Sequence, residues 1–270
     1  MTRMAAVQMT SGPRLPDNLE QAGRQIAAAA AAGARLVVLP ENFALMPIED
    51  ADRLAVVEKD GDGPIQEFLV AQAKKHRLWI VGGTIPLTAH DPGKVGAACL
   101  LFNDRGERVA RYDKIHLFDV QLDNGEKYHE SNSFEPGDAV VVADTPYGKL
   151  GLAVCYDLRF PELFRRLQEQ GAEIFAVPAA FTAHTGRAHW EVLLRARAIE
   201  NLVYVIAAAQ DGRHANGRET YGDSMIVNPW GEVLARLPHG AGYVVAECDH
   251  ARLQEVRKNL PSIRHRRLSS

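Results

Sequence analysis

Three residues that could cooperate in covalent catalysis each follow a segment with the pattern of a β-strand. Cys155 ends the apolar run GLAV, Glu41 follows ARLVVLP, and Lys114 follows RVARYD. A thiol becomes a useful nucleophile when a nearby cation lowers its pKa from about 8.5, or when a nearby carboxylate accepts its proton. The three residue types together predict attack by Cys155 on a carbonyl or nitrile carbon, with Glu41 as the base.

The negative charge that develops on the attacked substrate needs hydrogen-bond donors that are already in place. Lys114 and the backbone N–H of Tyr156 are positioned by sequence to provide them. Each residue alone has an ordinary explanation, because a cysteine in an apolar run is usually a core residue and a single lysine is usually on the surface. Their shared position at strand ends favours the catalytic interpretation.

Two other arrangements of side chains compete with this interpretation. His116, two residues after Lys114, could pair with Cys155 as in thiol proteases, but nothing in the sequence distinguishes it from the other histidines. His184 and His189 are five residues apart and have no carboxylate at a ligand interval, which is a poor zinc signature. We therefore expect no metal site.

The other two cysteines, Cys99 and Cys248, lie within strand patterns and are expected to be structural. Cys248 stands between Glu247 and Asp249, whose negative charge would keep it in the thiol form. Three cysteines without paired spacing argue against a secreted disulfide framework. We therefore expect a reducing, cytoplasmic location.

Strands and helices alternate along the chain. Apolar alternation and β-branched runs predict strands at residues 4–9, 35–39, 78–84, 97–103, 108–112, 139–144, 149–154, 173–177, 202–208, 223–228, 233–236 and 243–248. Helical patterns occupy residues 18–32, 63–76, 161–170, 187–200 and 250–258. Pro64 and Pro161 are each expected at a first helical position, and Gly171 is a plausible helix stop.

The connections between these elements are of two kinds. The turns NDRG at 103–106, TPYG at 145–148 and NPWG at 228–231 are tight enough only for antiparallel hairpins. Helical crossovers join the other strands, so we expect a mixed α/β sheet with a ligand site at the carboxyl ends of its strands. If the strands before Glu41, Lys114 and Cys155 are parallel neighbours, the three side chains meet at one rim.

Size and composition predict one domain over residues 1–270, with a basic tail at about 262–270 to which we assign no function. Apolar residues make up 46% of the 270 residues and charged residues 24%, as in soluble enzymes. The net charge of −3 disfavours nucleic acid and anionic membranes as partners. The N-terminus MTRMAAVQMT lacks the apolar run of a signal peptide, and no stretch reaches the roughly 18 apolar residues of a membrane helix.

Three motifs together resemble the nitrilase, or carbon–nitrogen hydrolase, superfamily. They are VVLPENF with Glu41, RYDKIHLFDV with Lys114 and GLAVCYDLRFPE with Cys155, and the resemblance extends from AAVQMT to SIRHRR. It implies a four-layer α-β-β-α sandwich with mixed sheets and a homodimer or higher homo-oligomer joined through helices. It also implies hydrolysis of a small, non-peptide amide without a metal or organic cofactor.

The resemblance also assigns roles to individual residues. It makes Glu41 the general base, Cys155 the residue that forms a thioester, and Lys114 the group that stabilises the tetrahedral species. Glu130, in YHESNSFEPGD, matches a second family glutamate that orients the lysine and the substrate amide. Without the resemblance, Glu130 would be interpreted as a solvated loop carboxylate.

The segments PAAFTAHTGRAHWEVLLRARAIENLVYVIAAAQ and YGDSMIVNPWGEVLAR resemble the branch of deaminated glutathione amidases and omega-amidases. Substrates of that branch are 5-amides of 2-oxoglutarate, with or without a cysteinylglycine tail, and end in an anionic α-keto acid. Arginine suits such a carboxylate, which makes Arg159 the candidate partner, unless it forms an ion pair with Glu162 or Asp157. By similarity, Phe181 and Thr185 line the same pocket.

Two departures from the branch and several alternatives remain. Asp223 stands where a histidine is expected, and the loop at 121–130 differs around Glu130. Another substrate is possible for the same residues, such as 2-oxoglutaramate, an N-carbamoyl compound, an aliphatic amide or a nitrile. A different class of function, an inert binding or scaffold subunit, would keep the fold without using the thiol.

Overall fold

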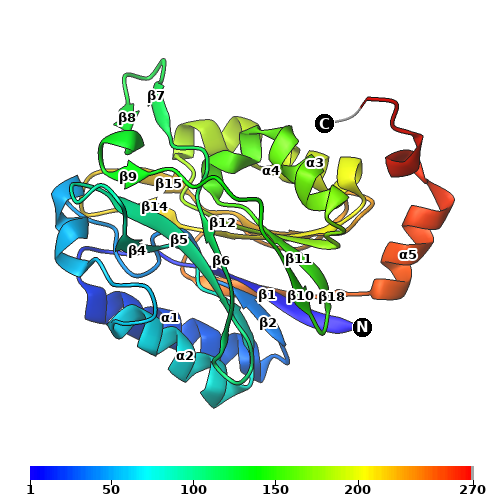
Figure 1. Ribbon diagram of the computed structural model, residues 1–270, viewed down its shortest axis with the longest axis horizontal. Coiled ribbons are helices and arrows are strands. Elements are labelled where there is room, and N and C mark those ends of the chain that lie inside the picture. The colour runs from blue at the N-terminus through cyan, green and yellow to red at the C-terminus, as the bar shows by residue number, and fades with distance from the viewer. Residues whose placement is uncertain (269–270) are drawn as a thin grey trace.

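The computed structural model describes residues 1–268, and most of its strands form two sheets that pack face to face (Figure 1). The first sheet has the strand order β18-β1-β2-β3-β5-β4, and β6 and β9 also pair with β5. Its strands are β1 (Thr2–Gln8), β2 (Leu36–Val38), β3 (Trp79–Val81), β4 (Ile85–Thr88), β5 (Val95–Phe102), β6 (Arg108–Asp113), β9 (Phe134–Glu135) and β18 (Gly242–Cys248). Because β1, β2 and β3 are parallel and β5 is antiparallel to β3, β4 and β6, the sheet is mixed.

The second sheet has the order β10-β11-β12-β13-β16-β17. Its strands are β10 (Val142–Thr145), β11 (Gly148–Leu152), β12 (Ile174–Ala179), β13 (Tyr204–Ala209), β16 (Ser224–Val227) and β17 (Val233–Leu237). Strands β11, β12 and β13 are parallel, and the outer pairs are antiparallel. Two separate hairpins, β7 (Asp119–Gln121) with β8 (Lys127–His129) and β14 (Asp211–Arg213) with β15 (Glu219–Tyr221), lie outside both sheets.

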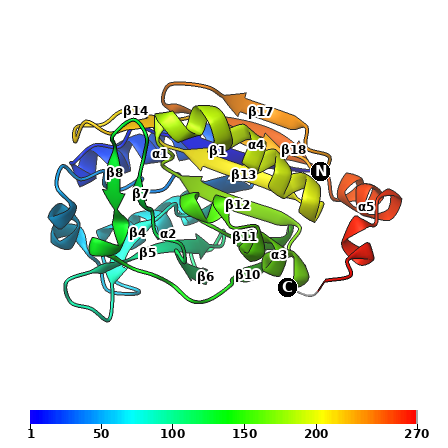
Figure 2. The same ribbon diagram turned by 90° about the horizontal axis from the view of Figure 1, so that it is seen from above.

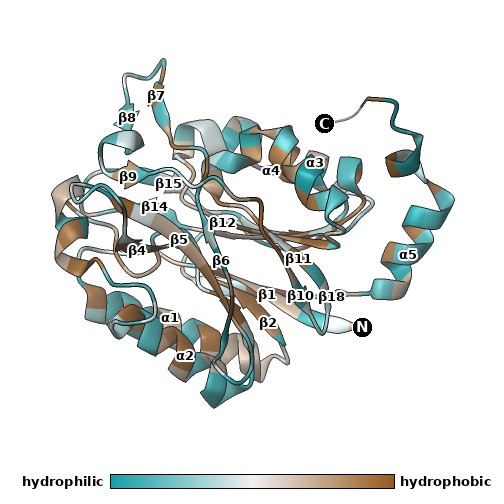
Figure 3. Cartoon of the chain, in the orientation of Figure 1, coloured by the Kyte–Doolittle hydropathy of each residue, from teal (hydrophilic) through white to brown (hydrophobic). Residues whose placement is uncertain are grey.

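Helices cover the outer face of each sheet. Helices α1 (Leu15–Ala31) and α2 (Pro64–His76) cover the first sheet, and α3 (Pro161–Glu169) and α4 (Ala183–Asn201) cover the second (Figures 1 and 2). Helix α5 (His250–Asn259) extends from β18 at one end of the sandwich, and Figure 3 shows that its surface is largely polar. The expected four-layer α-β-β-α sandwich with mixed sheets is confirmed.

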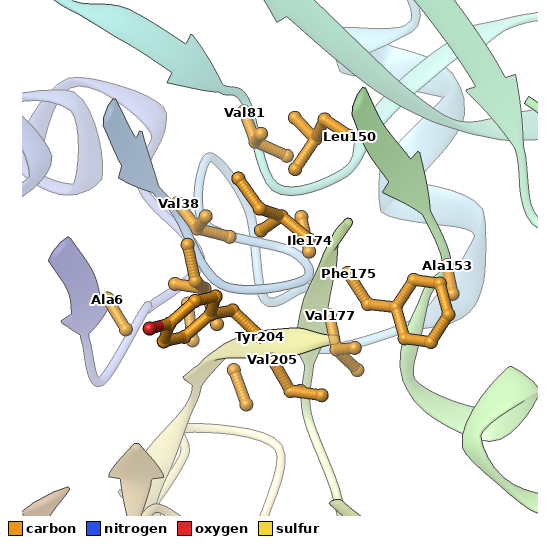
Figure 4. Close-up of a cluster of buried hydrophobic side chains, with 14 of the residues drawn as sticks. Ala6, Val38, Val81, Leu150, Ala153, Ile174, Phe175, Val177, Tyr204 and Val205 are labelled. Atoms are coloured by element: carbon orange, nitrogen blue, oxygen red, sulfur yellow. The ribbon is translucent and has the colours of Figure 1, made fainter. Parts of the chain in front are cut away.

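Strands β1 and β2 are buried on both faces over most of their length, so their alternate residues belong to two different cores. Residues in the core between the sheets include Met4, Ala6, Leu36 and Val38, and residues packed with α1 and α2 include Ala5, Val7, Val37 and Leu39. Figure 4 shows Val38 and Val81 close to Leu150 and Ile174 of the second sheet. Two-sided burial explains why these strands read as continuous apolar runs.

The predicted strands and helices each overlap an observed one, and the three predicted hairpins are antiparallel pairs, β5–β6, β10–β11 and β16–β17. Pro64 and Pro161 begin α2 and α3, as expected. The 3₁₀ helices η1 (Asp50–Val56), η2 (Glu130–Asn132), η3 (Cys155–Arg159) and η4 (Ser262–His265) were not predicted. The last two residues of the basic tail lie outside the described residues.

The strands that precede Glu41, Lys114 and Cys155 are not parallel neighbours, so the condition under which the three side chains would meet at one rim is not met. Strands β2 and β6, which precede Glu41 and Lys114, belong to the first sheet, whereas β11, which precedes Cys155, belongs to the second. The three strand ends therefore meet across the gap between two sheets, not along the rim of one.

Among the described helices, none is long and apolar enough to cross a membrane.

Candidate active site

Cys155 is the first residue of η3. It follows strand β11 of the second sheet, from which Ala153 and Val154 separate it. Its φ of 49° lies in the left-handed region, which costs an L-residue about 1–2 kcal/mol and needs support from its surroundings. That support comes from Asp157, whose carboxylate accepts a hydrogen bond from the backbone N–H of Val154 at 2.8 Å. The turn therefore fixes the backbone on both sides of the thiol.

Asp157 is completely buried and also binds the segment that follows β6. Tyr112 Oη donates to it at 2.6 Å, His116 donates its backbone N–H at 3.2 Å, and His116 Nδ1 lies 2.7 Å from the carboxylate. The imidazole also stacks on Phe160, with 3.6 Å between ring centroids. His116 is thus bound to Asp157, and the alternative Cys–His arrangement with Cys155 is not formed.

Lys114 lies at the centre of a buried cluster of charges. Its side chain is 1% exposed, and its Nζ lies 2.8 Å from Glu41 Oε1 and 2.8 Å from each carboxylate oxygen of Glu130. Glu130 also accepts the backbone N–H of Phe118 at 2.6 Å, which fixes its orientation. The structure therefore brings together Glu41, Lys114 and Glu130, and they line one pocket with Cys155.

Two glycines allow close backbone approaches beside this cluster. A Cβ on Gly83, which has a φ of +57°, would lie 2.1 Å from the carbonyl oxygen of Pro40, the residue before Glu41. A Cβ on Gly137 would lie 2.1 Å from the carbonyl oxygen of Asp113, the residue before the lysine. Any larger residue at either position would displace the segment that carries a member of the cluster.

The charges of the cluster determine the protonation state of each member. Burial would raise the pKa of Glu41, but the charge and hydrogen bond of Lys114 and a hydrogen bond from Cys155 hold it below its usual 4.5. Burial would lower the pKa of Lys114, but Glu130 and Glu41 raise it above its usual 10.5. Both groups are therefore charged at neutral pH.

Cys155 does not have the depressed pKa that a neighbouring cation predicts. Burial raises its pKa well above the usual 9.0, the charge of Glu41 adds to this, and the opposing charge of Lys114 is too weak to reverse it. The thiol is protonated in the free protein. A reaction in which this thiol attacks a substrate would have to remove its proton, and the adjacent Glu41 carboxylate is the group that can accept it.

The pocket is lined by charged, aromatic and small polar side chains. The predicted binding residues Tyr156, Arg159, Phe181 and Thr185 all line it. Arg159 stacks 5.3 Å from the Phe181 ring centroid, and its Nη1 lies 3.2 Å from His189 Nδ1. No carboxylate of the described residues pairs with this guanidinium, so the alternative ion pair with Glu162 or Asp157 is not formed.

Sequence reasoning missed part of the lining. The missed residues with charged or aromatic side chains include Arg53, Phe118, Lys127, Tyr128 and Arg218. Several come from short polar hairpins that carry no apolar pattern, so no signal in a single sequence separates them from surface residues.

Asp223 does not line the pocket. Its carboxylate pairs with Arg236 at 2.8 Å, and its backbone carbonyl accepts a hydrogen bond from the Trp190 indole N–H.

The remaining cysteines have structural surroundings. Cys99 and Cys248 are buried in strands, and burial raises the pKa of Cys248 to about 12. Cys248 is therefore in the thiol form, as expected, but the cause is burial and not the charge of Glu247 and Asp249. Among the described residues, no group of three or more histidine, cysteine and acidic side chains could hold a metal ion. His184, one of the two histidines considered for zinc, has its Nε2 2.7 Å from Asp123 Oδ1.

Comparisons with known proteins agree with this geometry. The sequence profile of the family described as carbon–nitrogen hydrolase matches residues 3–258. A protein of Yersinia enterocolitica named deaminated glutathione amidase is 44% identical over 269 residues, covering 99% of this chain and 93% of its own.

Two solved structures are similar over almost the whole chain. The C. elegans NitFhit protein has a TM-score of 0.91 at 36% identity and covers 98% of this chain, which spans 65% of that longer one. Saccharomyces cerevisiae Nit3, described as a member of branch 10 of the nitrilase superfamily, has a TM-score of 0.89 at 32% identity and covers 99% of this chain and 97% of its own.

Proposed function

The chain belongs to the carbon–nitrogen hydrolase family, and from this premise we propose that it hydrolyses deaminated glutathione to 2-oxoglutarate and cysteinylglycine. As a family member it is a hydrolase of carbon–nitrogen bonds other than peptide bonds. We therefore set aside the alternative of an inert binding or scaffold subunit. The observation that carries the proposal is the buried cluster of Glu41, Lys114 and Glu130 beside Cys155, in a pocket lined by further cations.

In the first half-reaction, the sulphur of Cys155 attacks the amide carbon while Glu41 accepts the thiol proton. The C=O double bond becomes a C–O⁻ single bond, and Lys114 and the backbone N–H of Tyr156 donate hydrogen bonds to that oxygen. When this intermediate collapses, the C–N bond breaks and the proton held by Glu41 passes to the departing amine. A thioester of Cys155 remains, and Glu130 keeps the lysine in position throughout.

In the second half-reaction, water attacks the thioester carbon and gives a proton to Glu41. The C–S bond then breaks, 2-oxoglutarate leaves, and the sulphur recovers the proton as a thiol. The protein ends in the protonation state in which it began, which is the state that the raised pKa of Cys155 and the lowered pKa of Glu41 favour. The cycle therefore needs no other acid or base.

The proposed partner of the keto-acid carboxylate is Arg159. Its guanidinium is unpaired with acidic groups of the described chain and stacks on Phe181, where its planar donors can bind a carboxylate through two hydrogen bonds. The N-terminus of α4, capped by Thr182 through the backbone N–H of Thr185, lines the same pocket. Its helix dipole adds a preference for negative charge there.

The test is to incubate the purified protein with deaminated glutathione and, separately, with 2-oxoglutaramate, and to measure 2-oxoglutarate by mass spectrometry. We expect release from deaminated glutathione, and none from a Cys155→Ala variant whose circular dichroism is unchanged. Release from 2-oxoglutaramate alone would reassign the substrate to the simple amide. Absence of 2-oxoglutarate from both substrates would refute this substrate class.

We further propose a homodimer in a reducing, cytoplasmic compartment. Large apolar side chains on the outer face of α4 and in the β16–β17 turn are exposed, with Val192 at 67% and Trp230 at 53%. The two elements are joined where Arg195 Nε donates to the Gly231 carbonyl at 2.8 Å. A second copy of the chain is the proposed cover of this face, and three buried free cysteines suit a reducing compartment.

A further inference from the structure

The pocket carries more positive charge than a substrate with one carboxylate would neutralise. Its lining carboxylates, Glu41 and Glu130, both bind Lys114 and are therefore already paired. The other cations of the lining include Lys127, Arg159 and Arg218. Like charges in a partly desolvated hollow repel one another, so this arrangement favours a ligand with more than one negative charge.

Arg218, in the turn between β14 and β15, has donors that the protein does not use. Its Nη2 donates to the carbonyl of Ala180, and its Cζ lies 5.2 Å from the ring centroid of Tyr128. Its Nε is buried and has no hydrogen-bond partner among the described residues. Because the side chain lines the pocket and only its Nη2 is bound to the protein, its other terminal nitrogen can donate to a ligand there.

Arg218 is also close to the reacting groups. Its charge contributes to the lowered pKa of Glu41, and Ala180, whose carbonyl it binds, has its backbone in contact with Cys155. Tyr128, on the other side of the guanidinium, belongs to the β7–β8 hairpin. Figures 1 and 2 show this hairpin and β14–β15 at the same end of the sandwich.

The two arginines are held by different parts of the molecule. Arg159 comes from η3 and rests against Tyr156 and Phe181, whereas Arg218 comes from the β14–β15 hairpin and rests against Tyr128. Two guanidinium groups that are held in different places are better suited to two carboxylates than to a single carboxylate. An amide substrate has two carboxylates when one ends its acyl half and another ends its amine half.

We propose that Arg218 binds a carboxylate on the amine half of the substrate, so that the enzyme selects amides with an anionic leaving group. The inference rests on the proposed function and deepens it. A leaving group of two residues places its carboxylate roughly 7 Å from the scissile nitrogen when extended, which is a suitable reach for a second site in the same pocket. A primary amide, whose leaving group is ammonia, has no such carboxylate.

The test compares three substrates on four proteins. The substrates are deaminated glutathione, its C-terminal carboxamide, which lacks the tail charge, and 2-oxoglutaramate. The proteins are the wild type, Arg218→Gln, Arg218→Lys and Arg213→Gln. Arg213 is an exposed arginine of the same hairpin that does not line the pocket, so Arg213→Gln is the matched control.

The decisive quantity is the ratio of kcat/KM for deaminated glutathione to kcat/KM for its carboxamide. We expect this ratio to be roughly 10-fold to 100-fold in the wild type and in Arg213→Gln, and to fall to about one in Arg218→Gln. Arg218→Lys, which keeps the charge but loses the paired donors, should retain part of the preference. Because a ratio cancels any general loss of activity, it separates recognition of the tail from a merely structural role.

Two results would overturn the inference in distinguishable ways. An unchanged ratio in Arg218→Gln, with 2-oxoglutarate still released, would refute the role of Arg218 and leave the proposed function standing. Failure of the wild type to release 2-oxoglutarate from any of the three substrates would refute the proposed function and this inference together.

Discussion

At the scale of single residues, the protonation state of Cys155 is the feature that most affects the chemistry. Burial and the charge of Glu41 keep it a thiol, although an ammonium group lies in the same cluster. Lys114 is neutralised by two carboxylates, so little of its positive charge remains to stabilise a thiolate. In the proposed mechanism the nucleophile therefore forms only as its proton moves to Glu41, and we expect the protonated thiol to react slowly with oxidants and alkylating agents.

A Glu41→Gln variant should separate the base from the nucleophile. Turnover should fall by roughly 10²-fold to 10⁴-fold because the proton acceptor is lost. The pKa of Cys155 should decrease, because Glu41 raises it in the wild type while the opposing charge of Lys114 stays. Ultraviolet titration of the thiolate, with Cys155→Ala as the blank, measures this shift. An increase in the pKa would contradict the electrostatic account.

The pH dependence of kcat/KM follows from the same shifts. Glu41 must be ionised, and its folded pKa is lowered, so activity should be lost only as the pH falls through a value below 4.5. Because the pKa of Cys155 is raised, no increase in activity from thiol ionisation should occur up to pH 9.0. The profile should therefore be flat from about pH 5 to pH 8. A rise centred near the ordinary thiol pKa would argue for a preformed thiolate.

At the scale of elements, η3 connects the nucleophile to the end of β6. Asp157 accepts hydrogen bonds from Tyr112, His116 and Val154, so one buried carboxylate fixes the turn of Cys155 and the strand end that presents Lys114. The sequence predicts a strand over residues 149–154, just before Cys155, but not this connection. Tyr112 and His116 lie 45 and 41 residues from Asp157 in the sequence, and proximity across the fold has no local pattern.

An Asp157→Asn variant tests that connection. Replacing an acceptor of several hydrogen bonds with an amide should reduce the free energy of unfolding by about 2–4 kcal/mol and kcat by roughly 10²-fold. Urea unfolding and steady-state kinetics give both values. Asp144→Asn, at a side chain that is 88% exposed on β10, is the control and should change neither. Full activity in Asp157→Asn would show that the turn does not depend on this carboxylate.

The prediction of elements succeeded where burial is two-sided and failed where strands are short and polar. Strands such as β5 and β12 contain no polar side chain and are buried throughout, so their positions could be predicted. The β7–β8 and β14–β15 hairpins have strands of three residues that include charged side chains, which resemble ordinary loops. These hairpins supply Tyr128 and bring Arg218 to the pocket, so that part of the site could not be predicted.

At the scale of the whole molecule, the active site depends on how two sheets pack. The first sheet supplies Glu41 and Lys114, and the second supplies Cys155, so the interface between the sheets sets the distance from base to nucleophile. The motifs could predict which residues take part, because each follows a strand. They could not predict that the strands lie in different sheets, because register between sheets is determined by core packing and not by local pattern.

The proposed dimer makes a prediction at the same scale. Val192→Glu combined with Trp230→Glu should convert a dimer to a monomer, because two charges would have to be buried without partners. Light scattering after size-exclusion chromatography measures the mass. Val109→Glu, at an apolar residue of β6 that is 40% exposed, is the control and should remain dimeric. A monomeric wild type, or a dimeric double variant, would contradict the proposed interface.

The central claim is that Cys155 becomes acylated by the keto-acid half of the substrate. The most direct measurement is mass spectrometry of protein quenched in acid during turnover of deaminated glutathione, followed by peptide mapping. We predict a 2-oxoglutaryl group on the peptide that contains Cys155, none on those of Cys99 and Cys248, and none in Cys155→Ala. Turnover that persists in Cys155→Ala, or an acyl group found only on another residue, would contradict the account.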